Sequence, residues 1–329
     1  MRILIIGGTR FVGRHIAQAA TDAGHDLTLF HRGKTGPGLF PSATHLTGDR
    51  NGDLAELGSG EWDATVDVSA YVPRQVRALA AALDGRGGRH QYISTVSVYR
   101  TPLPVNYTED APLIELDDRD TEQVTGATYG GLKVLCERAA VDAYGPDTTV
   151  IRPTYVIGPL DYTGRFTWWV NRLARGGEVL APGEPADPIQ VIDGRDMGSW
   201  AVDLLERKGS GTFHAVSPAP PFGFGDLLDA VAAEVAPGGT TLTWVDSDFL
   251  HAAGETDVSL PMWPRGDADT DALAASPAAA TAAGLAPRPL RETIRELWAY
   301  EQHSPTRIPD GVGLAPEREA ELLEQWRRR

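Results

Sequence analysis

The sequence predicts an α/β fold in which a doubly wound parallel sheet carries a second, smaller α+β domain. Three observations predict it. Short apolar segments alternate with amphipathic helical patterns through the first half of the chain. The first apolar segment ends in a glycine-rich turn, which leads directly into a helical pattern. After residue 155 this alternation gives way to a stretch rich in proline, glycine and tryptophan.

The first element combines a strand, a turn and a helix. RILIIGG (residues 2–8) is a short apolar strand, and the helical pattern after it is apolar on one face and ends at Gly24. Backbone N–H groups at such a turn bind a pyrophosphate, because the unpaired donors and the helix dipole both favour negative charge. Gly7 allows the tight turn, Gly8 leaves room for the ligand, and Gly13 lets the helix lie close to the strand. The expected cofactor-binding residues of this turn are Gly7, Gly8, Thr9, Arg10, Phe11, Val12 and Gly13.

The later elements repeat this order along the chain. Strands are predicted at residues 26–32, 44–50, 64–70, 89–95 and 148–153, and helices at about 73–84 and 123–144. Strands that are apolar on both faces indicate a parallel sheet covered by helices on each side. Ligands are therefore expected at the carboxyl ends of the strands. GTFHAVS (211–217) could return to this sheet as a seventh strand.

The change in composition and pattern after residue 155 predicts two domains. We expect residues 1–156, with about 196–217, to form a dinucleotide-binding domain of the Rossmann type. Residues 157–195 and 218–329 are expected to form the substrate-binding domain. A capped helix with one apolar face at the C-terminus is expected to pack on the rest of the chain or on another subunit. A homodimer is therefore one of the alternatives.

The composition narrows the classes of function. The chain has 329 residues, 42% of them hydrophobic, and a formal net charge of −15. This charge disfavours nucleic acid as a partner, because nucleic-acid binders need a basic face. The sequence contains neither a run of 18 apolar residues nor a signal-like segment, so we expect no membrane partner and a cytoplasmic location. The lone Cys136 is expected to be a buried structural thiol, and no metal site is expected.

The end of the second strand indicates which dinucleotide binds. An acidic residue there hydrogen-bonds the ribose 2'-hydroxyl, whereas an arginine accommodates a 2'-phosphate. Here the strand ends in FHRGK, with His31 and Arg32 and no carboxylate, and Arg10 replaces the central glycine of the usual fingerprint. Arg10 and Arg32 could converge on a 2'-phosphate, so NADP(H) is the preferred cofactor and NAD(H) is possible. Asp49, with Arg50 beside it, is expected to contact the adenine amino group.

The segment YGGLK contains a candidate catalytic pair. A spacing of four residues puts Tyr129 and Lys133 on the same face of a helix. The ammonium could then lie beside the phenol and lower its pKa, which would make Tyr129 a general acid or base. Only 3 of the 30 basic residues are lysines, so few tyrosine–lysine pairs with this spacing are expected by chance.

The segment YISTVSVY (92–99) ends a buried strand in hydroxyl groups. Its position places Thr95 at the crevice, where the hydroxyl could hydrogen-bond a substrate carbonyl or alcohol. Ser97 is the competing candidate, and Tyr99 is a tentative substrate contact.

Together with GGTRFVG, IRPTYVIGP and IQVIDGRDM, these segments follow a recognisable order. The sequence resembles the extended short-chain dehydrogenases/reductases of the NAD-dependent epimerase/dehydratase superfamily. Its GGTRF form is similar to an atypical subgroup that includes chloroplast stem-loop-binding-like proteins. The resemblance implies a catalytic triad of Thr95, Tyr129 and Lys133. It also implies cofactor contacts from Val68, Ser69, Ala70, Pro153, Thr154, Tyr155 and Val156.

The resemblance leaves several reactions open. Nucleotide-sugar dehydratases of this superfamily carry Thr-Asp-Glu at the strand end, whereas this chain has Thr95, Val96 and Ser97, so the elimination pair is absent. The NADP preference favours an oxidoreductase that reduces a ketone or imine, or oxidises the alcohol, of a small polar metabolite. The alternatives are an NAD(P)-dependent nucleotide-sugar epimerase and a catalytically silent RNA-binding or regulatory relative.

The sequence gives fewer indications of the residues that bind the substrate. GRFTWW supplies a cation and two indoles, Arg165, Trp168 and Trp169, and Gln190 could add a polar contact. Packing inside the smaller domain is the alternative for the tryptophans, because each indole buries a large area. A diphosphate would require arginines, for which the sequence offers Arg172, Arg265 and Arg288.

Overall fold

The computed structural model describes residues 1–36, 38–52, 54–264 and 273–329. A seven-stranded sheet forms its larger part, in the order β10-β6-β5-β4-β1-β2-β3, and all neighbouring strands are parallel. The predicted doubly wound fold is therefore confirmed. The strands are β1 (Arg2–Ile6), β2 (Asp26–His31), β3 (Thr44–Thr47), β4 (Ala64–Asp67), β5 (Arg89–Ile93), β6 (Thr149–Pro153) and β10 (Gly211–Ala215).

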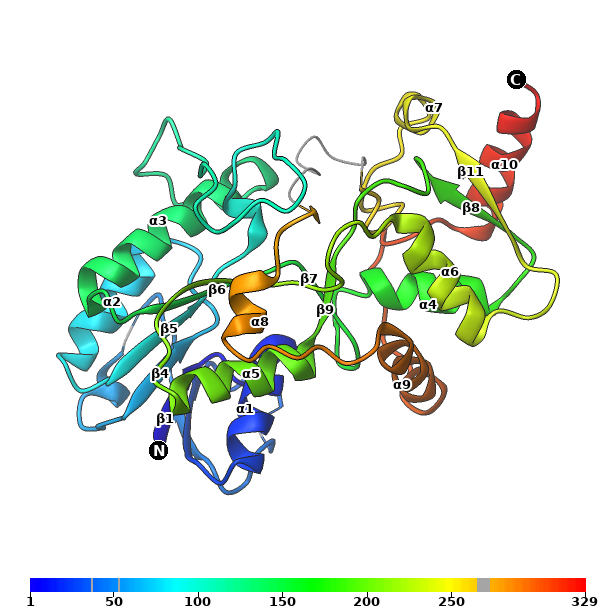
Figure 1. Ribbon diagram of the computed structural model, residues 1–329. Coiled ribbons are helices and arrows are strands. Elements are labelled where there is room, and N and C mark those ends of the chain that lie inside the picture. Colours follow the sequence, from blue (N-terminus) through cyan, green and yellow to red (C-terminus); the bar gives the residue numbers. More distant parts are fainter. Residues whose placement is uncertain (37, 53, 265–272) are drawn as a thin grey trace.

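The sheet is covered on both faces, as Figure 1 shows. Ile3 and Ile5 of β1 pack in the core beneath α1 and α5, whereas Leu4 and Ile6 pack in a cluster with the leucines of α2. This alternation puts apolar side chains on both faces of one strand, so each face requires a cover of helices. The covering helices are α1 (Phe11–Asp22) with α5 (Gly194–Glu206), and α2 (Pro73–Leu83) with α3 (Gly126–Tyr144).

The strands β2 to β5 all end one to three residues earlier than predicted, and the seventh strand is present. β4 stops at Asp67, because the carboxylate of that residue accepts a hydrogen bond from the Ser69 N–H and turns the chain. β3 is only four residues long. The segment predicted to return to the sheet forms β10, which pairs with β6. Cys136 is buried in α3, as predicted.

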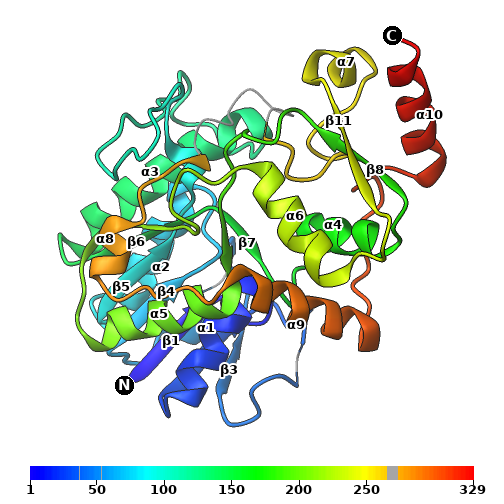
Figure 2. The same ribbon diagram turned by 45° about the vertical axis from the view of Figure 1, so that its right-hand side comes forward.

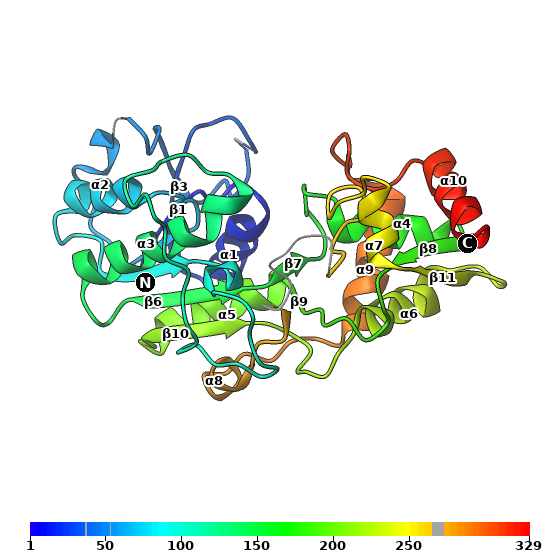
Figure 3. The same cartoon turned by 90° about the horizontal axis from the view of Figure 1, so that it is seen from above.

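A smaller α+β part lies beside the sheet (Figures 2 and 3). Its core gathers Phe166, Trp169, Phe224 and Trp263 around a two-stranded parallel sheet. The strands of this sheet are β8 (Glu178–Pro182) and β11 (Thr241–Val245). The associated helices are α4 (Arg165–Ala174), α6 (Phe224–Val235), α7 (Ser247–Ala252), α9 (Leu290–His303) and α10 (Pro316–Arg327).

The chain passes between the two parts through a second pair of parallel strands. These strands are β7 (Tyr155–Ile157) and β9 (Val191–Asp193). A short helix, α8 (Ala278–Ala282), lies against β10. No helix in the described ranges is long and apolar enough to cross a membrane. The predicted division of the chain into two sequence-discontinuous domains remains our proposal.

Candidate functional site

A cavity of about 1040 Å³ lies at the carboxyl ends of the central strands, where a doubly wound sheet places its ligands. Residues from the glycine turn, from the ends of β2, β4 and β5, and from α3 line it. The predicted site residues that line this cavity are Gly7, Thr9, Arg10, Phe11, Val12, His31, Arg32, Asp49, Arg50, Val68, Ser69, Thr95, Ser97, Tyr99, Tyr129, Lys133, Pro153, Thr154, Tyr155, Val156 and Arg165.

Three predicted cofactor residues lie behind the wall of the cavity. A Cβ on Gly8 would lie 2.5 Å from Leu29, and one on Gly13 would lie 3.1 Å from the Cα of Gly8. These two glycines therefore serve close packing of strand and helix, which corrects the expectation that Gly8 makes room for a ligand. Ala70 is fully buried, and its carbonyl oxygen accepts a hydrogen bond from Lys133.

The glycine turn fits a pyrophosphate. Gly7 has a φ of +111°, which side-chain-bearing residues rarely adopt, and it lines the cavity. Arg10, the N-cap of α1, makes no side-chain capping hydrogen bond, and the first turn of the helix contains no acidic residue. The first amides of α1 therefore keep free hydrogen-bond donors at the positive end of the helix dipole. This donor set suits the negative oxygens of a dinucleotide.

Free cations follow β2 at the edge of the cavity. Arg32 and Lys34 are exposed there, and neither has an ion-pair partner in the described part of the chain. The carboxylate of Asp49 accepts a hydrogen bond from the N–H of Asn51, so this side chain supports its own turn. His31 is held by His45 through a 2.8 Å hydrogen bond, and burial lowers its pKa.

Arg10 lies at a different border of the cavity. Its guanidinium stacks on the ring of Tyr162, with its central carbon 3.5 Å from the ring centroid. Tyr162 belongs to the segment between β7 and α4, so Arg10 bridges the glycine turn to the smaller part of the molecule. The joint grip of Arg10 and Arg32 on one phosphate stays a prediction.

Thr95 and Tyr129 meet inside the cavity. The Thr95 hydroxyl accepts a hydrogen bond from the Ser97 N–H and lies 3.1 Å from the Ser97 hydroxyl, which fixes it at the end of β5. Burial raises the pKa of Tyr129 to about 12, and a hydrogen bond with Thr95 opposes this rise. The Tyr129 phenol is therefore a protonated group at neutral pH.

Lys133 lies one helical turn after Tyr129 but is directed elsewhere. Its ammonium donates to the carbonyl oxygens of Ala70 at 3.0 Å and Ile93 at 2.7 Å. Burial lowers the pKa of Lys133 to about 8. The expectation that this ammonium lowers the pKa of Tyr129 is wrong, because two carbonyls hold the ammonium and burial dominates at the phenol.

Two ion pairs with well-covered side chains lie next to the cavity, and one of their arginines, Arg50, also lines it. Arg50 binds Asp67 through two hydrogen bonds, of 2.6 and 2.9 Å, so its guanidinium is committed to that carboxylate. Arg152 pairs with Glu137 in the same way, at 3.0 and 2.7 Å. The sequence signal for these pairs is a charged residue inside an apolar strand, as in ATVD and TVIRP, and the interpretation above overlooked it.

The substrate candidates separate into two groups. Arg165 lines the cavity and stacks on Tyr155 at 4.8 Å, and its charge lowers the pKa of Tyr129. Trp168 and Trp169 lie instead in the core of the smaller part, where the Trp169 indole donates to the Pro261 carbonyl. Their tentative role as substrate contacts is therefore corrected to packing.

Other polar candidates are occupied by contacts inside the protein. The Gln190 side chain is buried and hydrogen-bonds backbone groups of Pro218 and Ala275, so its predicted substrate role is also corrected. Tyr99 lines the cavity, but its hydroxyl contacts Arg152 and His214. The arginines considered for a diphosphate are likewise committed: Arg172 pairs with Glu319, and Arg288 pairs with Asp196. Arg265 lies outside the described residues.

Sequence reasoning missed two aromatic residues of the cavity. The ring of Tyr71 lies 6.3 Å from that of Tyr129, and Tyr162 covers the glycine turn. Tyr71 directly follows the predicted cofactor segment Val68 to Ala70, and that adjacency was the available signal. In the described ranges, no group of three or more histidine, cysteine or acidic side chains is placed to hold a metal ion.

This fold and site define a dinucleotide-binding enzyme of the short-chain dehydrogenase/reductase type. Residues 3–214 match the model of the NAD dependent epimerase/dehydratase family. The chain belongs to that family, whose members are NAD-dependent enzymes.

Solved structures show the same fold at low sequence identity. The chain is similar to the Bordetella bronchiseptica enzyme WbmH in complex with NAD+, with a TM-score of 0.70, 19% identity, and coverage of 92% of this chain and 99% of that one. It is also similar to UDP-glucuronic acid 4-epimerase from Bacillus cereus in complex with NAD, with a TM-score of 0.67, 15% identity, and coverage of 93% and 100%.

One curated relative matches over a shorter range. The chloroplast stem-loop binding protein of 41 kDa b from Arabidopsis thaliana is 26% identical over 254 residues, which is 70% of this chain. The chain spans 62% of the length of that relative.

Proposed function

We propose that the protein is an NADP(H)-dependent oxidoreductase that reduces a ketone or imine of a small polar metabolite, or oxidises the corresponding alcohol. One observation carries the cofactor preference. Arg32 and Lys34 follow β2 at the cavity edge without a carboxylate partner in the described chain. A free guanidinium at this position accommodates a 2'-phosphate, whereas a ribose hydroxyl would favour an acidic residue.

Residues of this chain supply the remaining chemistry. A bound nicotinamide dinucleotide supplies the hydride. In this proposal Thr95 holds the reacting oxygen or nitrogen of the substrate and Tyr129 gives it a proton; both line the cavity. Lys133 lines the same cavity with its ammonium bound to the carbonyls of Ala70 and Ile93, and we propose that it also binds the ribose hydroxyls. Arg165 adds a positive charge on the substrate side of Tyr129.

Tyr129 is the proposed proton donor of the reductive direction. With a pKa of about 12, this phenol carries a proton at neutral pH and can donate it to a developing alkoxide. The same group would take the proton back when the alcohol is oxidised, because both directions share one transition state. The choice of reduction therefore rests on the proposed preference for NADP(H).

A nucleotide-sugar epimerase is the second candidate. Membership of an epimerase/dehydratase family favours it, and a similar solved structure is a UDP-glucuronic acid 4-epimerase in complex with NAD. An epimerase of this kind keeps its NAD bound through the cycle. Purified protein that retains NAD and does not consume added NADPH would establish this candidate in place of the reductase.

The cofactor preference is tested by fluorescence titration with NADPH and NADH. We expect tighter binding of NADPH, and we expect Arg32→Ala to weaken NADPH by about tenfold, because one charge-assisted contact is lost. The affinity for NADH should stay unchanged. Arg77→Ala, an exposed arginine on α2, is the matched control and should change neither affinity. Equal affinities for both dinucleotides in the unmodified protein would contradict the proposal.

RNA binding is the third possibility, because one relative carries a stem-loop binding name. The net charge of −15 opposes it, since contacts with a phosphate backbone require a basic surface. We therefore propose a small-molecule substrate and no nucleic-acid partner. Salt-dependent retention of a stem-loop RNA in a gel-shift experiment would contradict this part of the proposal.

A further inference from the structure

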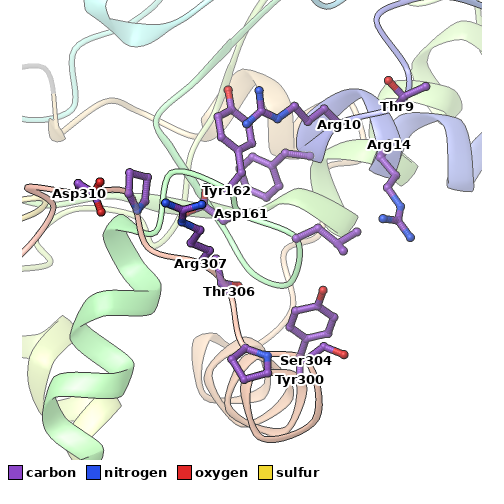
Figure 4. Close-up of a pocket in the computed structure, with 14 residues that line it drawn as sticks. Thr9, Arg10, Arg14, Asp161, Tyr162, Tyr300, Ser304, Thr306, Arg307 and Asp310 are labelled. Atoms are coloured by element: carbon purple, nitrogen blue, oxygen red, sulfur yellow. The ribbon is translucent and has the colours of Figure 1, made fainter. Parts of the chain in front are cut away.

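A second cavity, of about 630 Å³, lies on the other side of the Arg10–Tyr162 stack. The beginning of α1 forms one wall, and the segment between β7 and α4 forms another. The third wall comes from the end of α9 and the residues that follow it (Figure 4). The proposed reaction leaves this second cavity unused, because Thr95, Tyr129 and Lys133 all line the first one.

Three arginines surround the second cavity. Arg10 and Arg14 come from the beginning of α1, and Arg307 comes from the segment after α9. In Figure 4, Arg14 and Arg307 lie on opposite sides of the hollow, and Arg10 lies beside the ring of Tyr162. In the part of the chain that the structure describes, none of the three has a carboxylate partner.

The three arginines differ from the well-covered arginines of the molecule. The protein carries a formal net charge of −15, and Arg50, Arg152 and Arg172, whose side chains are 10% exposed or less, all bind carboxylates. Three unpaired guanidinium groups around one hollow repel one another, and the positive end of the α1 dipole adds to their field. An anion in the cavity would compensate this charge.

The carboxylates of the second cavity offset only part of the charge of the arginines. Asp161 is 2% exposed, and its carboxylate accepts hydrogen bonds from the N–H and the hydroxyl of Thr163. Asp310 is the other carboxylate of the lining, so three cations face two acidic groups and the positive charge is in excess.

We propose that the second cavity binds a small phosphate-bearing ligand, separate from the dinucleotide and the reacting substrate. Guanidinium groups match phosphoryl oxygens with paired N–H donors, so Arg14 and Arg307 would contact the ligand from opposite sides of the hollow. The hydroxyls of Tyr300 and Ser304 add polar groups to the same wall. The volume exceeds that needed for a single phosphate and falls within the range of small-molecule sites.

The test uses pyrophosphate as the probe, in isothermal titration calorimetry at low salt. Titrations are run on the free protein and on protein saturated with NADPH, so that binding in the first cavity is separated from binding in the second. We expect one pyrophosphate to bind in the second cavity under both conditions; in the free protein the glycine turn can hold another, which NADPH displaces. Arg14→Gln and Arg307→Gln should each weaken it by about tenfold, because each removes one charge-assisted contact. Arg138→Gln, an exposed arginine on α3 at the other face of the sheet, should leave it unchanged.

Two results would overturn the proposal. One is unchanged pyrophosphate affinity in both Arg14→Gln and Arg307→Gln while their thermal unfolding matches the unmodified protein. The other is complete displacement of pyrophosphate by NADPH, which would place the probe in the first cavity. If neither NADPH nor NADH binds, the proposed oxidoreductase fails, but the two arginine variants still test the second site on the free protein.

Discussion

The floor and the rim of the main cavity use positive charge in opposite ways. In the floor, which we define as the ion pairs Arg50–Asp67 and Arg152–Glu137, each guanidinium is buried and bound to a carboxylate. In the rim, defined as Arg32, Lys34 and Arg165, none of the cations has a carboxylate partner in the described chain. The difference indicates that burial with pairing serves the fold, whereas an unpaired cation at the cavity edge is available to a ligand.

Tyr129 is the proposed proton donor, so its loss should have the largest effect on activity. We expect Tyr129→Phe to lower NADPH-dependent turnover of a carbonyl substrate by about 10²- to 10⁴-fold, because the proton donor is removed. NADPH affinity should stay within a few-fold. Steady-state kinetics with a substrate found by screening carbonyl compounds measures the change. Tyr71→Phe removes another phenol from the same cavity and should cost less than tenfold; equal losses in both variants would argue against the role of Tyr129.

The ion pairs of the floor should contribute strongly to the free energy of unfolding. Glu137→Gln leaves the Arg152 guanidinium buried without its counter-charge, which is expected to lower the free energy of unfolding by about 3–5 kcal/mol. Urea denaturation followed by circular dichroism measures this loss. Glu122→Gln breaks an exposed ion pair with Arg74 and should cost less than about 1 kcal/mol. If both substitutions cost the same, the distinction between a paired floor and a solvent-facing pair would be lost.

Lys133, which interacts with charged groups of the floor, makes the stability of the protein depend on pH. Its pKa of about 8 in the folded protein is lower than the ordinary value of 10.5, so between these values the unfolded chain binds more protons. Stability should therefore rise with pH across this window, by about 1 kcal/mol per pH unit from this residue. Urea unfolding at pH 7.5, 8.5 and 9.5 in the unmodified protein and in Lys133→Met isolates the contribution, since the variant lacks the titrating group.

Lys208→Met provides the control for that pH series, because Lys208 is exposed. Its unfolding should follow the same pH dependence as the unmodified protein. Parallel curves for the unmodified protein and Lys133→Met would show that the ammonium is not desolvated as the structure implies.

The helices and strands could be predicted from the sequence because each depends on a pattern of neighbouring residues. The first strand alternates its side chains between two apolar faces, and the glycine turn follows within the same few residues. Similar local patterns placed α2 and α3 within a few residues of their observed bounds. Lengths of β3 and β4 were overestimated, because the turn that ends β4 depends on the Asp67 carboxylate.

The missed features of the site depend on partners far apart in sequence. The sequence left Arg172 as a candidate for binding a diphosphate, but in the fold it pairs with Glu319, which is 147 residues away in the chain. The direction of Lys133 depends on the carbonyls of Ala70 and Ile93, which its own helix does not reveal. The indoles next to Arg165 could not be assigned to core or cavity, because the helical spacing that buries them is compatible with either.

Arg165 offers the finest test of the rim. It is half-buried, stacks on Tyr155 and donates one long hydrogen bond to the Thr163 hydroxyl, but it forms no ion pair in the described residues, so Arg165→Gln should cost less than about 1 kcal/mol of stability. If the substrate contacts this guanidinium, KM should rise by about tenfold, because a charge-assisted hydrogen bond is lost on binding. The change in kcat should be smaller, since Thr95 and Tyr129 remain in place. A fall in stability with an unchanged KM would contradict this role and would show that Arg165 supports the fold, as the arginines of the floor do.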